Sequence, residues 1–455
     1  MKSDANDELV NRFLDAAVPR PDSHHKGGLL APALEMLAAH PRLAASSFLA
    51  ACVLGDVVEV ARQLGTDALP AVTPGGPRGW APLVYLCFSR FLRDQKDRAG
   101  DFVRCAELLM DRGADPNSSF PATHDGNYPE RCLYGAAGVA NCAPLAQILL
   151  DAGADVNDDE SLYHASEFAD NAALRVLLRA KPRPDWVSYN MCHKMDMEDP
   201  AGLKLFIDHD GDANFLIDRG LFNSYCPLHF AVFRRRSRAC FELLLDAGAD
   251  PNLAGSDGVT PYQLARKLGL NEIAELFLSR GARDDLDDRT RFLAVLSSAN
   301  ERTARAMLDR DPSLRTGLTD RDHRLLVDAT ESGNVNAVRL MLDLGFPLET
   351  RQTTCGGWDA TALHHAAWHG QADVVRLLLD RGADPKLKHS FGGDALSAAI
   401  HGANHAGHDR GPQVVELIAR AYKPEELDHS IAYADSEANT DVQQVLRNVK
   451  EQQKG

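Results

Sequence analysis

The sequence lacks the features of membrane-spanning and secreted proteins. It contains no apolar run of the ~18 residues that a membrane helix needs, and residues 1–8 contain neither an apolar stretch nor a small-residue cleavage site. Its nine cysteines are scattered singly, with no CxxC pair. Such cysteines indicate buried thiols in a reducing compartment, not a disulfide framework. We therefore expect a cytoplasmic protein.

Basic clusters and common cofactor motifs are also scarce. The formal net charge is −16, and the longest basic run is Arg234–Arg236. Because binding through phosphates requires a basic surface, we expect neither nucleic acid nor a membrane as a partner. The chain has no phosphate-binding loop, no GxGxxG after a strand and no GxSxG elbow. No cofactor is expected.

A seven-residue string that ends in Gly-Ala-Asp recurs along the chain. Its paired leucines or Leu-Met suit the apolar stripe of a helix, and its glycine suits the left-handed residue that ends one. Asp-x-Asn then begins a turn. The spacings between the glycines of successive copies divide into units close to ~33 residues. The clear copies are Leu109–Asp115, Leu149–Asp155, Leu244–Asp250 and Leu378–Asp384.

A second string precedes the first by about half a repeat. Its Thr or Ser suits a helix N-cap, and its proline suits the first helical turn. The best copy is Thr361–Ala367, and the others are Cys226–Ala231, Ser161–Ala165, Asn190–His193 and Thr260–Ala265. Two strings in phase predict a series of helix-turn-helix units.

The second string resembles the TPLHxA opening of ankyrin repeats. The resemblance implies an all-α ankyrin-repeat solenoid of about eleven helix-turn-helix units with short hairpin-like fingers. We assign residues 1–45 to an N-terminal helical cap, 46–428 to the array, and 429–455 to a C-terminal capping helix and tail. Further strings resemble a group of large bacterial ankyrin-repeat proteins without settled activity, which suggests a bacterial origin: Gly75–Trp80, Tyr85–Arg90, Leu133–Gly138 and Tyr163–Glu167.

In ankyrin folds, the two positions after the Ala-Ala of each opening face the concave groove. Exposed apolar residues at such positions are typical of a binding surface. The histidines of the openings, by contrast, are interpreted as structural: His164, His193, His229 and His364. We expect Arg78 and Trp80, in a glycine-rich finger, to overhang the groove. The residues at the groove positions are Phe168, Met197, Glu198, Phe233, Arg234, Lys267, Glu331, Trp368, His369 and His401.

Three repeats carry a charged residue where the second alanine is normally buried: Glu167, Asp196 and Arg266. Three interpretations remain open. The charges form a structural network that joins Glu167 to Lys194 and Asp196 to Arg266, or they bind a ligand. In the third, Glu167 and Asp196 are the acid/base pair of an enzyme, because two carboxylates beside a groove suit proton transfer.

Histidines cluster near the C-terminal end of the array. His365 and His369 lie one helical turn apart, and His401 belongs to the next repeat. Two or three imidazoles are able to hold zinc or another transition metal. No glutamate follows His365 as it would in an HExxH motif, so we expect no bound metal. If a metal ion is bound, these three histidines are the expected site.

The sequence therefore favours a cytoplasmic recognition scaffold that binds a protein or peptide along its concave groove. A rigid solenoid lowers the entropic cost of binding. The alternative is an enzyme built on the solenoid and acting on a small polar substrate. In it, Glu167 and Asp196 act as acid and base, and Lys194, Arg78 or Tyr163 orients the substrate.

Overall fold

A computed structural model describes residues 2–21, 27–65, 67–122, 128–217, 224–353, 357–406, 409–436 and 439–454. Cys355 and His408 lie outside these ranges. The chain divides into two compact units, each described below by itself. Of the described residues, those up to 217 and 224–255 form unit 1, and those from 256 onward form unit 2.

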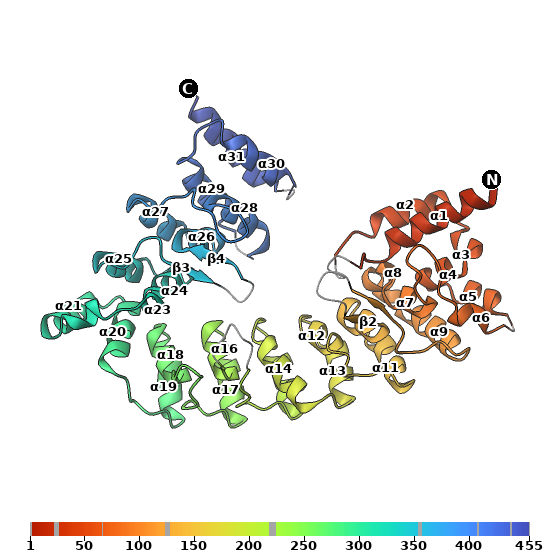
Figure 1. Ribbon diagram of the computed structural model, residues 1–455, viewed down its shortest axis with the longest axis horizontal. Coiled ribbons are helices and arrows are strands. Elements are labelled where there is room, and N and C mark those ends of the chain that lie inside the picture. The colour runs from red at the N-terminus through yellow and green to blue at the C-terminus, as the bar shows by residue number, and fades with distance from the viewer. Residues whose placement is uncertain are drawn as a thin grey trace. The chain divides into compact units, whose positions relative to one another are not determined.

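Unit 1 begins with three helices and continues as six helix pairs (Figure 1). The first three are α1 (Lys2–Ala17), α2 (Ala31–Ala39) and α3 (Leu43–Ser46). The pairs are α4 (Phe48–Leu54) with α5 (Val57–Leu64), α7 (Pro82–Cys87) with α9 (Ala99–Met110), α10 (Cys132–Tyr134) and the π-turn η2 (Gly135–Val139) with α11 (Ala143–Asp151), α12 (Ser161–Ala165) with α13 (Ala172–Arg179), α14 (Pro184–Lys194) with α15 (Pro200–Asp208), and α16 (Pro227–Phe233) with α17 (Arg238–Asp246). Short connecting helices are α6 (Leu69–Val72), α8 (Arg90–Asp94) and η1 (Lys96–Arg98).

Unit 2 contains five further pairs and two closing helices. The pairs are α18 (Pro261–Lys267) with α19 (Asn271–Ser279), α20 (Asp288–Ser297) with α21 (Glu301–Arg310), α24 (Leu325–Glu331) with α25 (Val335–Asp343), α26 (Ala362–Trp368) with α27 (Ala372–Asp380), and α28 (Ala395–His405) with α29 (Gly411–Ala419). The short helices α22 (Ser313–Thr316) and α23 (Asp320–His323) precede α24, and the closing helices are α30 (Leu427–Ser436) and α31 (Thr440–Gln452). The described residues of the two units thus contain eleven pairs, which agrees with the predicted number of about eleven.

Within the described ranges, strands are confined to two antiparallel hairpins. In one, β1 (Ser119–Pro121) pairs with β2 (Pro129–Arg131), so that Phe120 faces Glu130. In the other, β3 (Arg351–Thr353) pairs with β4 (Asp359–Thr361), and Gln352 faces Ala360. Each hairpin leads into the first helix of a repeat, as expected for the fingers of an all-α solenoid.

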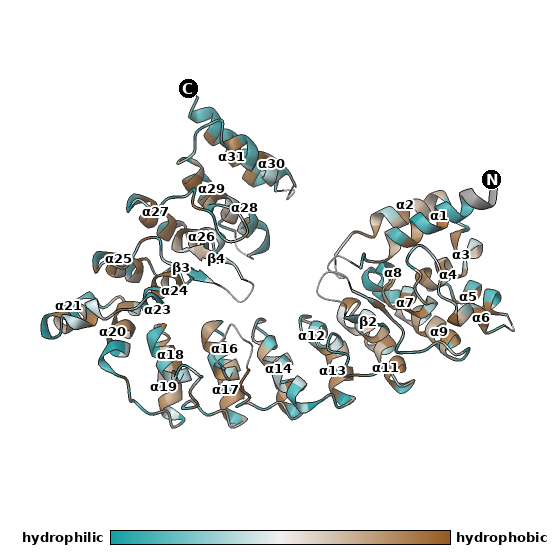
Figure 2. Ribbon diagram, viewed as in Figure 1, coloured by the Kyte–Doolittle hydropathy of each residue, from teal (hydrophilic) through white to brown (hydrophobic). Residues whose placement is uncertain are grey.

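The local chemistry of the two strings explains the helix pairs. Thr260 caps α18 by accepting a hydrogen bond from Gln263 N, and the Gln263 side chain accepts one from Thr260 N. After the second helices, glycines such as Gly382 adopt positive φ (88°). The leucine at the start of each clear string copy is fully buried: Leu109, Leu149, Leu244 and Leu378. In Figure 2, second helices such as α17 and α27 accordingly carry apolar segments.

Asparagines of the Asp-x-Asn turns join successive repeats. Asn117 donates to Gly153 O (3.0 Å) and accepts from Asp155 N (2.8 Å) in the following turn. Asn214 makes the same two bonds, to Gly248 O (2.9 Å) and from Asp250 N (2.8 Å). The side-chain amide thus replaces the hydrogen bonds that the backbone of each turn lacks. Among the described residues, no helix combines the length and apolarity required to cross a bilayer.

Candidate functional site

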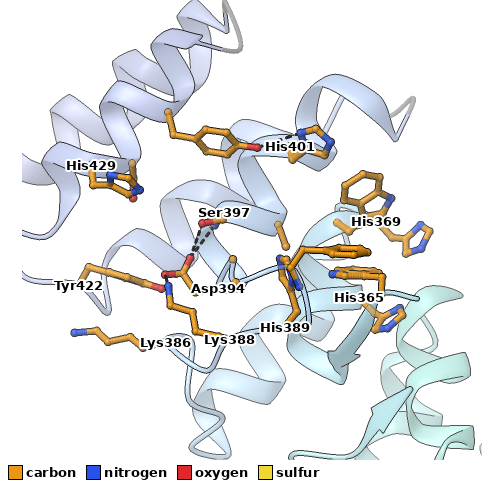
Figure 3. A pocket seen from close by; sticks show the side chains of 18 of the residues that line it. His365, His369, Lys386, Lys388, His389, Asp394, Ser397, His401, Tyr422 and His429 are labelled. Carbon is orange, nitrogen blue, oxygen red and sulfur yellow. Dashed lines mark hydrogen bonds and ion pairs between the residues drawn. The ribbon is translucent and has the colours of Figure 1, made fainter. Parts of the chain in front are cut away.

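A cavity of ≈ 990 Å³ lies in unit 2. It is within the size range of ordinary ligand sites. Repeat helices α24, α26 and α28, the turn between α27 and α28, and the closing helix α30 all contribute residues to its wall. Figure 3 shows the charged and aromatic side chains that surround it. Five of the lining residues are aromatic: Trp358, Trp368, Phe391, Tyr422 and Tyr433.

Groove positions from three successive repeats meet in this cavity. Glu331 is the last residue of α24, Trp368 and His369 lie at the end of α26, and His401 lies in α28. The repeat pattern assigned these four residues to the concave face. The structure places all four on the wall of a single cavity.

The aromatic side chains form a continuous apolar wall. The Trp358 ring lies 5.7 Å from the Trp368 ring and 4.6 Å from the His365 ring, and Trp368 lies 5.2 Å from His401. Phe391, in the turn before α28, remains 69% exposed. A large apolar side chain left in solvent beside an aromatic wall is typical of a contact surface.

The opposite wall carries charges of both signs. Lys388 pairs with Asp394 (2.9 Å), and Lys386 pairs with Glu426 (2.7 Å). Burial would raise the pKa of Asp394, but hydrogen bonds from Lys388 and Ser397 outweigh it and lower that pKa. Asp394 is therefore ionised at neutral pH and is engaged by its own neighbours.

His365 bridges two repeats at the edge of the cavity. Its Nδ1 lies 2.7 Å from a carboxylate oxygen of Glu331. Among the described residues, one group of three could hold a metal ion, namely Glu331, His365 and His369, whose ligand atoms lie within 4.8 Å of one another. This group corrects the expected ligand set, because His401 is not part of it. His401 instead approaches the Tyr433 hydroxyl (3.2 Å).

In unit 1, His193 lies between the two candidate acid/base carboxylates. Its Nε2 is 3.6 Å from Glu167 and its Nδ1 is 3.3 Å from Asp196. Arg234 also pairs with Asp196 (2.6 Å), and His164 lies 3.0 Å from Glu167. Both carboxylates are thus held by neighbouring repeats, as in a structural network.

The partners of that network differ from those expected. Lys194 pairs with Asp199 (2.8 Å) and not with Glu167, and Arg266 lies near Glu275 (3.7 Å) and not Asp196. The sequence spacing indicated which positions are charged. It did not indicate that Asp199, five residues after Lys194 along the chain, turns back toward the ammonium group.

Lys194 is fully buried, which corrects its proposed role in orienting a substrate. Its ammonium group donates to Ser166 O (2.7 Å), Phe168 O (3.1 Å) and Asn171 Oδ1 (3.1 Å). These bonds and the Asp199 ion pair offset the cost of burying a charge. Lys194 therefore anchors the turn of the preceding repeat.

The glycine-rich finger does not overhang a groove as expected. Trp80 is only 5% exposed and stacks on Phe120, with ring centroids 4.1 Å apart. Arg78 pairs with Asp15 of α1 (3.1 Å) and lies over the Trp80 ring. Apolar burial of the indole and the Arg78 ion pair hold the finger against its own unit.

The other groove residues of unit 1 are partly exposed. Phe168 and Met197 are half-buried, and Phe233 is exposed beside Tyr225 (5.2 Å). Glu198 accepts a hydrogen bond from Ser237 N (3.1 Å) at the start of α17. Unit 1 therefore offers apolar side chains singly, whereas unit 2 gathers them around a cavity.

Two histidines of the repeat openings have purely structural surroundings. His364 is buried, with Nδ1 2.7 Å from Thr361 Oγ1 and Nε2 3.0 Å from Leu387 O. Burial and the positive surroundings lower its pKa to about 4, so it is neutral. His229 contacts Cys226 in the same way (3.1 Å). His164 and His193 instead face carboxylates, as described above.

Sequence reasoning missed four of the five aromatic residues of the cavity: Trp358, Phe391, Tyr422 and Tyr433. One signal was available. The chain has four tryptophans, and two of them, Trp358 and Trp368, flank the best copy of the second string.

Comparisons with known proteins agree with the repeat pattern. The family model for three copies of ankyrin repeats matches residues 292–389, and the model for a single ankyrin repeat matches residues 223–256. The ankyrin repeat protein YahD of Escherichia coli is 29% identical over 146 residues, which cover 30% of this chain and 73% of that protein.

Two further matches are more limited. The E3 ubiquitin-protein ligase hecd-1 of Caenorhabditis elegans is 35% identical over 119 residues, which are 22% of this chain and only 4% of the ligase. The human ASB11 ankyrin repeat domain is 20% identical and matches 50% of this chain and 96% of that domain, with a TM-score of 0.23. The repeat models, the bacterial relative and the two strings in phase identify the chain as an ankyrin-repeat protein.

Proposed function

We propose that this protein is a cytoplasmic recognition scaffold that binds a segment of a partner protein in the cavity of unit 2. Ankyrin repeats are generally protein-interaction scaffolds, and the proposal assigns that role to one surface. The observation that carries it is the meeting of groove positions Glu331, Trp368, His369 and His401 in one aromatic-walled cavity.

The composition of the wall indicates the kind of segment that fits. Trp358, Trp368 and Phe391 offer a surface for one large apolar side chain, which would supply most of the affinity. Lys386 and Glu426 provide both donors and acceptors for the backbone of an extended peptide. A cytoplasmic location is supported by the eight described cysteines, which are free and buried.

The alternative of an acid/base enzyme has less support. A general base must reach the proton that it abstracts, whereas Glu167 and Asp196 are already engaged by His164, His193 and Arg234. The arrangement favours a role in joining repeats.

A library of random peptides displayed on phage, selected on the chain of 455 residues, tests the proposal. We expect enriched sequences with a large apolar residue, whose binding Trp368→Ala weakens at least tenfold. Trp186→Ala is the matched control, because Trp186 stacks on Tyr189 in unit 1 and lies outside the cavity. The proposal fails if nothing is enriched, or if both variants bind the selected peptides equally well.

A further inference from the structure

We propose that Glu331, His365 and His369 form a binding site for a divalent transition metal of the zinc class in the wall of the unit 2 cavity. The inference goes beyond partner recognition and does not depend on it, because it concerns the binding of the metal ion alone.

The fold brings the three ligands together from two repeats. His365 lies in α26, and His369 follows that helix directly, so the two imidazoles are one turn apart. Glu331 ends α24, the first helix of the preceding repeat. One ligand atom from each lies within 4.8 Å of the other two. In Figure 3, His365 and His369 lie on the same side of the cavity.

The surroundings of His365 point to a missing ligand. The side chain is buried, and Nδ1 lies 2.7 Å from Glu331. Nε2 is also buried, yet it has no hydrogen-bond partner. Buried polar atoms in proteins are nearly always satisfied, so the second nitrogen of His365 is left available, while Nδ1 is the nitrogen that lies on the same side of the ring as Glu331. The other buried histidine of the same helix, His364, has partners for both nitrogens.

The donor set selects the class of metal. Two imidazoles and one carboxylate suit zinc and neighbouring first-row metals, whereas calcium and magnesium prefer sets made of oxygen alone. Bonds to zinc are about 2.0–2.2 Å long, so the ligand atoms of a tetrahedral site are closer together than 4.8 Å, and small side-chain rotations close the difference. Three protein ligands leave a fourth position free, and all three residues line the cavity.

A simple ion pair between Glu331 and His365 is the competing interpretation. It accounts for the 2.7 Å contact. It does not account for the approach of His369 to both residues. The two interpretations differ in one measurable respect, since only the metal site requires His369.

Titration of the metal-free chain of 455 residues with Co²⁺, followed by its visible absorption, tests the site. We expect one equivalent to bind with the intense bands of four-coordinate cobalt, and Zn²⁺ to displace it. His369→Ala should weaken binding by at least about 100-fold, since even loss of an outer-shell partner costs 10–100-fold. Glu331→Gln should weaken it in the same direction.

His401→Ala and His429→Ala are the matched controls, because both histidines line the same cavity outside the three-ligand group. They should bind Co²⁺ as the unaltered chain does, and circular dichroism establishes that every variant is folded. The proposal is overturned if the unaltered chain binds no stoichiometric metal. It is equally overturned if His369→Ala binds normally, or if the control variants lose as much affinity as His369→Ala.

Discussion

The imidazole of His193 lies flat on the ring of Tyr163, with ring centroids 3.9 Å apart and planes at 10°. The two residues occupy the openings of successive repeats, α12 and α14. The stack fixes the imidazole between Glu167 and Asp196. Tyr163, once a candidate for orienting a substrate, thus holds a histidine in an ionic link between repeats.

The His193 link should make stability depend on pH. Burial alone would lower the pKa of His193, but the neighbouring carboxylates of Asp196 and Glu167 outweigh it and raise that pKa above its ordinary value of 6.5. The charged histidine therefore stabilises the fold fully below pH 6.5, and this contribution is lost as the pH rises through the raised pKa. We expect the melting temperature to exceed that of His193→Gln by more at pH 5.5 than at pH 8.5. A difference that does not change with pH would contradict the link.

Replacement of Lys194 by methionine should destabilise unit 1. The substitution leaves the part-buried Asp199 and two carbonyl groups without their cation, and loss of one partner of a buried pair costs up to about 3–5 kcal/mol. Urea denaturation measures the change. Lys204→Met is the control, because Lys204 pairs with Asp208 on an exposed helix face, and its loss should cost less than about 1 kcal/mol. Comparable effects of the two substitutions would show that Lys194 is no anchor.

Gly402→Ala should force α28 away from α26. A Cβ atom at residue 402 would lie 2.4 Å from Trp368 O and 2.8 Å from Trp368 Cα, and backbone atoms have little room to move. We expect a loss of about 1–3 kcal/mol from overpacking, together with weaker peptide binding. Gly100→Ala is the control, since nothing lies within 4 Å of its Cβ in α9. It should be neutral or stabilising by up to about 1 kcal/mol, and equal thermal shifts would argue against the predicted clash.

Trp80→Ala should act on folding and not on binding. The indole is buried against Phe120, and loss of a buried tryptophan costs about 3–5 kcal/mol. Chemical denaturation gives the free energy of unfolding, and the selected peptides report on the cavity of unit 2. A folded variant of normal stability with impaired peptide binding would restore Trp80 as a ligand contact.

The repeat architecture was predictable because its signals are local. Capping residues such as Thr260, left-handed glycines such as Gly382 and the buried leucines act within one helix pair, so the strings and their spacing predicted about eleven pairs. The π-turn η2 and the division into two units were not predicted. Neither feature has a signature in the spacing of the strings.

The residues of the candidate site were predictable only where they occupy positions that recur in every repeat. Glu331, Trp368 and His401 followed from their place after each opening, and His369 from its spacing to His365. Phe391 and Tyr433 belong to a turn and a closing helix, whose positions depend on tertiary packing. Lys194 was misjudged for a related reason. Exposure of a charged residue cannot be read from sequence when backbone carbonyls of the preceding repeat surround it.

The asparagine bonds between turns explain how the array tolerates changes in length. The bond from Asp155 N to Asn117 closes over 38 residues, whereas the equivalent bond from Asp250 N to Asn214 closes over 36. The same hydrogen bond therefore forms although the number of residues between the two turns differs, because it depends only on the distance between the turns in space. The finger β1–β2 lies in the chain between the turns at Asn117 and Asp155, and the hydrogen bonds between these turns are formed in its presence. New loops can consequently be gained in evolution without a new way of joining one repeat to the next.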